Sequence, residues 1–470
     1  MDCKLTRRDL LAGLSLAVCA ASPLAAADRG GVPLYSNDSQ SIYRVRMTVG
    51  VKGNAKVPKT NLSVDATRQL PVTADSVIDY EERLFRDSHG LAQAAQRYYY
   101  EATTKGQVQT NDVKSGLRSE ARHAVLHVDQ TRSVVYASQT QFTVDELELL
   151  KVPVNSLAID RLLPNKKVEV DGSWAVEEDV LATLFDMDAV QKSDVNATLA
   201  SFDDATAKIQ LLGSISASVD GVPTSIQLRG KLTYDRKQQT VTWLALAVHE
   251  DRELGKAKPG FDVAAQIRVI RQPLAKPNAI DSSASIDLAT KPSEDKLLID
   301  IRSPQGGFSV FCDRNWHLIN ANDRFAQLRM IDNDRVISQC DVRTMPELKA
   351  GHQLTLEAFQ DDIQRTLGDR FGEFLEAEEK VTSGELRLLR VVAQGSVEKI
   401  PVQWIYLHLS NDDGRRSAAI FTLADEQMEQ FGGGDHQFAE GFRFIAIDKS
   451  AADPAKQVAD AKSVGKPSVK

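Results

Sequence analysis

The chain has 470 residues, of which 42% are apolar and 26% are charged, and its formal net charge is −8. This length usually corresponds to two or three domains, and the composition is that of a folded globular protein, which excludes disordered and collagen-like classes. A mild acidic charge gives no general attraction to nucleic acid or to anionic membranes. We therefore expect no nucleic-acid partner.

Residues 1–27 show the three parts of a cleavable secretory signal. Arg7 and Arg8 lie in a basic start, an apolar stretch follows at 10–21, and three alanines end at Ala27. The run around the two arginines resembles the twin-arginine export motif, although position 10 is leucine where that motif prefers an aromatic residue, so the general secretion route stays open. We expect cleavage after Ala27, a mature net charge of about −9, and a location in the periplasm, in the cell envelope or outside the cell.

Two other interpretations of this segment remain. The apolar stretch is shorter than the roughly 20 residues that span a bilayer, which disfavours a membrane anchor. Cys19 ends a run that resembles a lipobox, but Val18 stands where the lipobox has Gly, Ala or Ser. No later stretch is long and apolar enough to cross a membrane, so we expect no transmembrane segment in the mature chain.

Strand patterns dominate residues 41–271, after a polar segment at 28–40 that we expect to be flexible. From Tyr43 to Val49 apolar residues alternate with polar ones, which is typical of a strand with one buried face. Asp220-Gly221 lies between two alternating runs and predicts a tight hairpin.

Short helices interrupt these strands. Thr143 and Glu146 form a capping-box pattern that predicts a helix start, and apolar spacing predicts further helices at 156–163 and 180–185. The region is therefore expected to be a β-rich antiparallel domain with a few helices against its sheet, built as a half-barrel or as a sandwich.

The rest of the chain changes character twice. Residues 272–296 contain three prolines and no aromatic residue, which predicts a linker. Residues 297–448 alternate strands with a helix from Thr355 to Leu367, which predicts a smaller α/β sandwich and gives the whole chain an α+β class. We expect a turn at Gly432–Gly434, with no helix starting there, and a closing strand at 438–445. The Lys/Ala-rich tail, 449–470, is expected to be disordered.

The order of elements in 297–448 resembles the family of the photosystem II extrinsic protein PsbP and its Ran-binding relatives. The resemblance includes the helix from Thr355, the strand Ser417–Leu423 and a closing aromatic-basic-aromatic run that ends at Phe444. It implies a compact sandwich that serves as a partner-binding or accessory module, and it carries over no functional residue.

Residues 41–271 more loosely resemble the LolA-like periplasmic carriers of lipids and lipoproteins. The basis is a long antiparallel meander with short helices midway, after a signal peptide. This resemblance implies an open half-barrel whose concave face could shelter an acyl chain.

Four residues are candidates for special roles in the mature chain. Cys312 and Cys340 could form a disulfide in an oxidising compartment, and the alternative is a pair of buried free thiols. Trp404 and Tyr406 share one face of a predicted strand and could form a binding face, the alternative being core packing. We identify no catalytic, cofactor or metal motif.

Three hypotheses follow for the function. The first is an exported non-catalytic binding or accessory protein whose partner is a lipid, a lipoprotein or a protein; an apolar groove lined from alternate strand positions would favour the lipid. The second is an extracytoplasmic hydrolase, which needs a cleft with convergent acids or a Ser/Cys–His pair whose pKa values are perturbed. The third is a structural protein of the envelope, with neither groove nor cleft.

Overall fold

The structure is a computed structural model that describes residues 31–36, 41–60, 63–129, 132–151, 153–256, 258–281, 286, 288, 291–322, 324–349 and 351–447. Arg7, Arg8, the cleavage site at Ala27 and the tail at 449–470 lie outside the described residues. Within them, no helix has the length and apolar character needed to cross a membrane.

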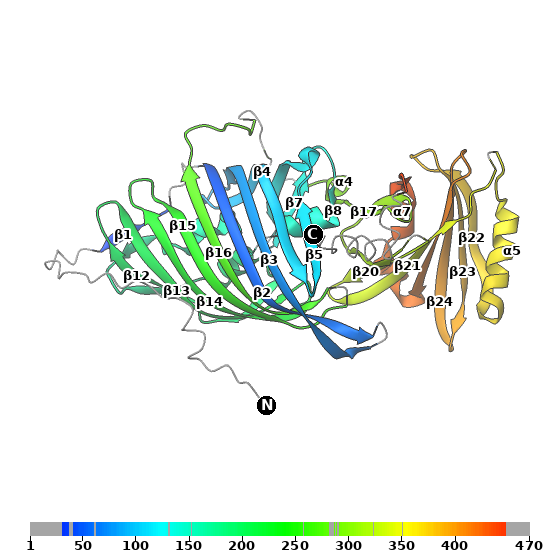
Figure 1. Ribbon diagram of the computed structural model, residues 1–470, viewed down its shortest axis with the longest axis horizontal. Helices are drawn as coiled ribbons and strands as arrows, with labels where there is room; N and C mark the ends of the chain where they lie inside the picture. The colour runs from blue at the N-terminus through cyan, green and yellow to red at the C-terminus, as the bar shows by residue number, and fades with distance from the viewer. Residues whose placement is uncertain are drawn as a thin grey trace, which may run out of the picture.

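One antiparallel sheet of 13 strands occupies most of residues 42–273 (Figure 1). Its main path is β10-β12-β13-β14-β15-β16-β2-β3-β4-β6-β7, with β11 beside β13 and β5 beside β4. The two ends of this path are not paired with each other in the described part of the chain, so the sheet is open. Its strands are β2 (Ile42–Thr60), β3 (Ser63–Arg86), β4 (Ala92–Val108), β5 (Asn111–Gly116), β6 (His123–Asp129), β7 (Arg132–Ala137), β10 (Ser173–Ala175), β11 (Ala189–Ser193), β12 (Asn196–Phe202), β13 (Thr206–Val219), β14 (Val222–Asp235), β15 (Thr240–Arg252) and β16 (Gly260–Pro273).

The alternation predicted for the first long strand is confirmed. Tyr43, Val45 and Met47 are fully buried, and the residues between them are partly or fully exposed. We call the face that bears these three residues the inner face. The predicted hairpin is also confirmed, because Val219 pairs with Val222 across the turn. Gly221 has a φ of 78° there, which glycine adopts without steric strain.

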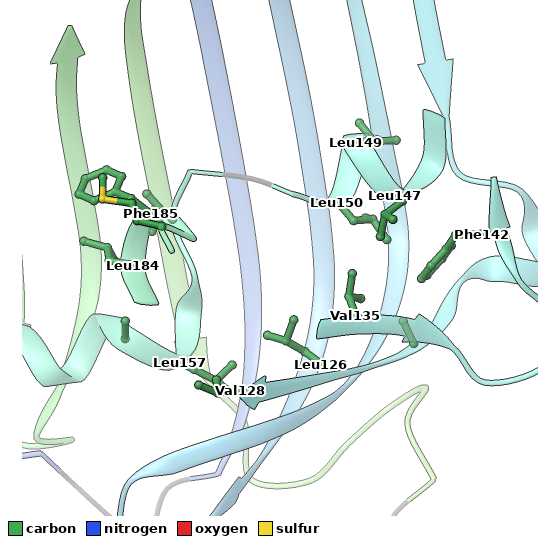
Figure 2. Close-up of a cluster of buried hydrophobic side chains, with 14 of the residues drawn as sticks. Leu126, Val128, Val135, Phe142, Leu147, Leu149, Leu150, Leu157, Leu184 and Phe185 are labelled. Atoms are coloured by element: carbon green, nitrogen blue, oxygen red, sulfur yellow. The ribbon is translucent and has the colours of Figure 1, made fainter. Parts of the chain in front are cut away.

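Short helices pack against the inner face. They are α1 (Val144–Leu150), α2 (Ser156–Ile159), the 3-10 turns η2 (Ser119–Ala121) and η3 (Asp160–Leu162), and α3 (Glu178–Phe185). The predicted capping box starts α1: the Glu146 amide donates to Thr143 Oγ1 at 3.3 Å, and the Thr143 amide donates to a Glu146 carboxylate oxygen at 2.9 Å. Figure 2 shows the apolar side chains of these helices gathered with those of β6 and β7, beside the strands of the sheet.

The segment 28–40 is not wholly flexible. Within it, β1 (Val32–Leu34) pairs with β9 (Lys166–Val168), and Val32 and Leu34 are buried in the main core. The expectation of a flexible segment is therefore wrong for these residues. The two apolar side chains drive the pairing because they leave water on the same side of a short strand.

A second antiparallel sheet of seven strands follows, in the order β19-β20-β21-β25-β24-β23-β22. The helix α5 (Leu356–Leu367) begins after the N-cap Thr355 and packs on one face of this sheet. The helices α6 (Met428–Phe431) and α7 (Gly434–Gly441) contribute Phe431 and Phe438 to the other face, where both rings pack against Phe421. The strands are β19 (Trp316–Ala321), β20 (Phe325–Asp332), β21 (Arg335–Met345), β22 (Phe371–Val381), β23 (Arg387–Val397), β24 (Ile400–Ser410) and β25 (Arg416–Ala424), with the 3-10 turns η4 (Gly368–Arg370) and η5 (Asp425–Gln427).

The predicted closing strand at 438–445 is wrong over most of its length. Gly432 and Gly433 adopt left-handed φ values of 59° and 76° and form the turn between α6 and α7. Helix α7 begins at Gly434, contrary to the expectation that no helix starts at this turn, and of the predicted strand only β26 (Phe442–Phe444) is extended. Helix forms there because it buries Phe438 completely against the second sheet.

A third sheet joins the two regions of the chain. It has the order β26-β18-β17-β8, with β8 (Phe142–Thr143), β17 (Ile299–Ser303) and β18 (Phe308–Cys312). Residues 299–300 pair in parallel with Phe142 and Thr143, and α4 (Glu294–Leu297) precedes β17. The segment predicted as a linker, 272–296, also contacts the large sheet. The amides of residues 278–280 donate to the carboxylate of Glu81 on β3.

Candidate functional site

Cys312 and Cys340 are free and fully buried in the structure. Burial raises the pKa of both thiols well above its ordinary value. Both side chains belong to the main hydrophobic core. As free thiols they are therefore protonated, apolar packing groups and poor nucleophiles.

Trp404 and Tyr406 lie beneath α5, where they are 5% and 6% exposed. Their neighbours in that cluster include Phe359 and Ile363 of the helix. The proposed binding face is therefore covered by the chain itself, and the structure shows the packing alternative.

A large hollow of the described structure lies against the inner face of the large sheet. We call this cavity, of about 920 Å³, the apolar chamber. Its floor consists of inward-facing residues at alternate positions on several strands: Val49 and Val51 of β2, Ile226 of β14, Val248 of β15, and Phe261, Val263, Ala265 and Ile267 of β16. Elsewhere on the inner face, such alternating apolar residues are covered by a helix. Here they remain uncovered and form the apolar wall of a hollow.

Both regions of the chain close this chamber. Val144 of α1 and Phe185 at the end of α3 line one side. Ile301 of β17 and His317 of β19 line another side. The parallel pairing of β8 with β17 brings these walls together, so the chamber depends on the contact between the two regions.

Charged side chains in and beside the lining of the chamber form a connected series of ion pairs. Lys258 donates to Asp220 at 2.8 Å and to Glu148 at 3.2 Å. Arg132 pairs with Asp220 at 2.7 Å and with Asp188 at 3.1 Å. These partners come from helix α1, from loops and turns, and from the start of β7. They are far apart in sequence, so no sequence motif marked them.

The charges of this series lower the pKa values of two of its acids. Burial would raise the pKa of Asp220, but Lys258 and its basic neighbours outweigh burial and hold the pKa far below its ordinary value. The pKa of Glu148 is lowered in the same way by Lys151 and Lys258. A general acid needs a raised pKa to hold its proton near neutral pH. Asp220 and Glu148 are therefore ionised near neutral pH and are poorly suited to act as general acids.

The turn between β20 and β21 meets two connections of the large sheet beside the chamber. The amide of Lys256 donates to Asp334, at the turn between β20 and β21, at 2.5 Å. A Cβ atom added at Gly221 would lie 2.7 Å from the carbonyl carbon of Asn333 in the same turn. Glycine is therefore required at this position for close approach as well as for its positive φ.

The opposite end of the inner face is filled and carries two buried charge clusters. Arg271 donates to Asp160 of η3 at 3.0 Å, and Thr240 donates to the same carboxylate at 3.0 Å. Arg97 and Glu82 both bind Ser156 of α2, at 2.8 and 2.6 Å. These side chains are less than a tenth exposed, and they fasten the α2–η3 segment to the sheet.

The sequence did contain a signal for these clusters. Glu82, Arg97 and Arg271 occupy positions in phase with the buried apolar residues of their strands. A charged residue at an inward position must be paired, because an unpaired buried charge is strongly unfavourable. Among the described residues, no group of three or more potential ligands is placed to hold a metal ion.

Comparisons with known proteins give limited similarity. No family model matches the chain, and no curated protein matches it. A solved structure of cyanobacterial PsbP from Synechocystis sp. PCC 6803 is 14% identical, with a TM-score of 0.27 over 35% of this chain and 99% of that one. The Ran-binding protein Mog1p of Saccharomyces cerevisiae is 8% identical, with a TM-score of 0.24 over 32% and 96%.

A third solved structure matches more of the chain at a lower score. It is OccK5 of Pseudomonas aeruginosa, which is 9% identical, with a TM-score of 0.12 over 81% of this chain and 97% of that one. At these scores no function is transferred from any of the three proteins. The resemblance to LolA-like carriers stays a prediction from the sequence.

Proposed function

We propose that the protein is an exported, non-catalytic carrier that holds the acyl chain of a lipid or lipoprotein in the apolar chamber. The observation that carries this proposal is the apolar floor built from alternate positions of four strands. Ligand pockets commonly enclose about 300–1,000 Å³ and are lined mostly by apolar side chains, and the chamber has about 920 Å³. Transfer of an acyl chain from water to such a wall is favourable in proportion to the apolar area that it buries.

Two further observations support the proposal. The segment 1–27 has the pattern of an export signal, and acyl chains and lipoproteins are present in the envelope to which export would deliver the protein. Asp220 and Glu148, which line the chamber, have lowered pKa values and are ionised near neutral pH, so neither is suited to be the general acid of a hydrolase.

The first experiment is native mass spectrometry of the protein purified gently from the envelope of its own host. We expect an added mass that extraction with organic solvent removes. A bare chain in every preparation would count against a carrier, and attention would then move to protein partners. The measured mass also decides whether the N-terminus begins after Ala27.

A second experiment places the ligand in the chamber. We expect a fluorescent fatty acid to bind the purified protein and Val263→Phe to weaken that binding at least tenfold, because Val263 lines the floor and a phenyl ring would occupy the hollow. Ile270→Phe on the same strand is the matched control, because Ile270 is 48% exposed on the outer face. Equal affinities of the two variants would place the fatty acid elsewhere.

A further inference from the structure

A second cavity of about 580 Å³, which we call the polar chamber, adjoins the apolar one. Asp220, Lys258 and His317 line both chambers, so the two are contiguous at this point. The walls of the polar chamber include Arg314 and the Asp332–Asp334 turn. If an acyl chain occupies the apolar chamber, as proposed above, its head group lies next to or inside the polar chamber.

The series of charges between the chambers alternates in sign and has no net charge. Lys151 lies 3.7 Å from Glu148, and Glu148, Lys258, Asp220, Arg132 and Asp188 follow in order, each paired with the next. A head group beside this series would face a basic and an acidic side chain at the same time. A lone anion is attracted by one member and repelled by the next, so the series gives no preference for net negative charge.

Arg314 is the exception among the bases of the polar chamber. Its Nε donates to the Leu297 carbonyl at 2.6 Å and its Nη2 to the Val135 carbonyl at 2.8 Å. The described residues place no carboxylate within ion-pair distance of it and no partner on its Nη1. Burial lowers the pKa of Arg314 to about 10, and the nearby Asp313 opposes that effect only in part. A partly buried guanidinium without an acid partner is suited to a phosphate oxygen.

Acidic side chains supply negative charge in the polar chamber. Asp332 and Asp334 line it at the turn between β20 and β21. The whole lining carries six acids and five bases, so an additional anion would increase an existing negative excess. A head group that contains both a phosphate and an ammonium adds no net charge and can face both kinds of side chain.

We propose that the protein selects an amphiphile with a zwitterionic phospholipid head, whose phosphate binds Arg314 and whose ammonium faces Asp332 and Asp334 while its acyl chain lies in the apolar chamber. This proposal rests on the carrier function and names the class of its ligand.

The test is displacement of the fluorescent fatty acid by single-chain amphiphiles of equal chain length at physiological salt. We expect lysophosphatidylcholine to bind at least tenfold tighter than lysophosphatidylglycerol and monoacylglycerol. Equal or tighter binding of the anionic lysophosphatidylglycerol would overturn the head-group proposal and leave the carrier function intact. Absence of binding by the fatty acid and by all three amphiphiles would overturn both.

Binding measurements on variants of Arg314 test whether this side chain binds the phosphate of the head group. We expect Arg314→Gln to weaken lysophosphatidylcholine about tenfold and to leave monoacylglycerol unchanged, with partial recovery in Arg314→Lys. Arg335→Gln is the matched control, because Arg335 is exposed beside the turn between β20 and β21 and lines neither chamber. The unchanged monoacylglycerol affinity shows that the variant is folded. If Arg314→Gln does not fold, the ranking of the three amphiphiles on the unmodified protein decides the proposal.

Discussion

The two ends of the inner face have the same alternating sequence pattern, but one end is packed and the other faces a hollow. On β16, Val263 lines the apolar chamber, whereas Val269, six residues along the same face, is 1% exposed and lines none of the cavities described. The difference lies in what covers the strand. The α2–η3 segment is fastened over one end through Asp160 and Ser156, and the other end is roofed by α1, the end of α3 and the second region of the chain, which leave a hollow.

The two ends also differ in how they hold charge. At the filled end the side chains of Arg271 and Asp160 are paired at 1% and 9% exposure. At the hollow end Lys258 and Asp220 are paired at 25% and 31% side-chain exposure. Loss of one member of the first pair leaves a buried charge without its partner, whereas solvent partly screens the second pair. The filled end is therefore a structural anchor, and we expect the ion pairs of the hollow end to contribute less to the free energy of unfolding.

The largest effect that we expect comes from breaking the buried pair. Asp160→Ala leaves the Arg271 guanidinium buried without its carboxylate, which costs about 3–5 kcal/mol of unfolding free energy. Lys258→Met at the hollow end is the comparison, with an expected cost of about 1 kcal/mol because its partners are partly solvated. Urea denaturation of the two variants measures both values. Similar costs would show that the two ends do not differ in this way.

Truncation of apolar side chains gives the next largest effect. Leu244→Ala on β15 removes a side chain that is 1% exposed and lies outside the chamber lining, so we expect a loss of about 2–5 kcal/mol. Ile226→Ala on the chamber floor removes atoms that already face a hollow on one side, and we expect about 1–2 kcal/mol because fewer packing contacts are lost. Thermal and urea unfolding would show a similar loss for both variants if the chamber were filled in solution by the protein itself.

Much of the local structure could be predicted because its causes are local. The capping box at Thr143, the helix from Thr355 and the turn at Gly221 each depend on residues within a few positions of one another. The closing strand at 438–445 failed because Phe438 and Phe442, four residues apart, suit a helical face as well as a strand, and tertiary burial of Phe438 decided in favour of helix.

The chamber itself could not be predicted. Val263, Ala265, Ile267 and Val269 have one alternating pattern, and nothing in that pattern says which members will be covered. The ion pairs beside the chamber involve residues such as Arg132, Asp220 and Lys258. These residues are far apart in sequence and come together only when the chain folds. What the sequence could have shown is the filled end, through charged residues at inward positions.

Enlarging one side chain at each end should also distinguish the two ends, with a smaller change in the free energy of unfolding. Val269→Phe inserts extra volume into a packed site, and we expect a destabilisation of about 1–3 kcal/mol. Val263→Phe on the same strand and face enters the hollow, so we expect almost no loss of unfolding free energy together with the weaker fatty-acid binding described above. If Val263→Phe were as destabilising as Val269→Phe, the chamber would not be a preformed hollow.

The smallest expected effect concerns His317, which is shared by both chambers. Burial first, and the charge of Lys258 next, lower the pKa of His317 to about 4, against the opposing charges of Asp220 and Glu148. The folded protein therefore disfavours the protonated ring, whereas the unfolded chain protonates it near pH 6.5. The stabilising contribution of the neutral ring is complete above pH 6.5 and is lost as the pH falls toward 4.

Because His317 is partly exposed, we expect this loss to be below about 1 kcal/mol. The measurement is the unfolding free energy of the protein and of His317→Gln between pH 7 and pH 4, taken as a difference. His408, whose pKa is also lowered to about 4 by burial, contributes equally to both proteins and cancels. We expect the difference to shift in favour of the variant as the pH falls. A difference that stays constant would mean that the ring is as well hydrated in the folded protein as in the unfolded chain, and the junction of the two chambers would then be open to bulk water.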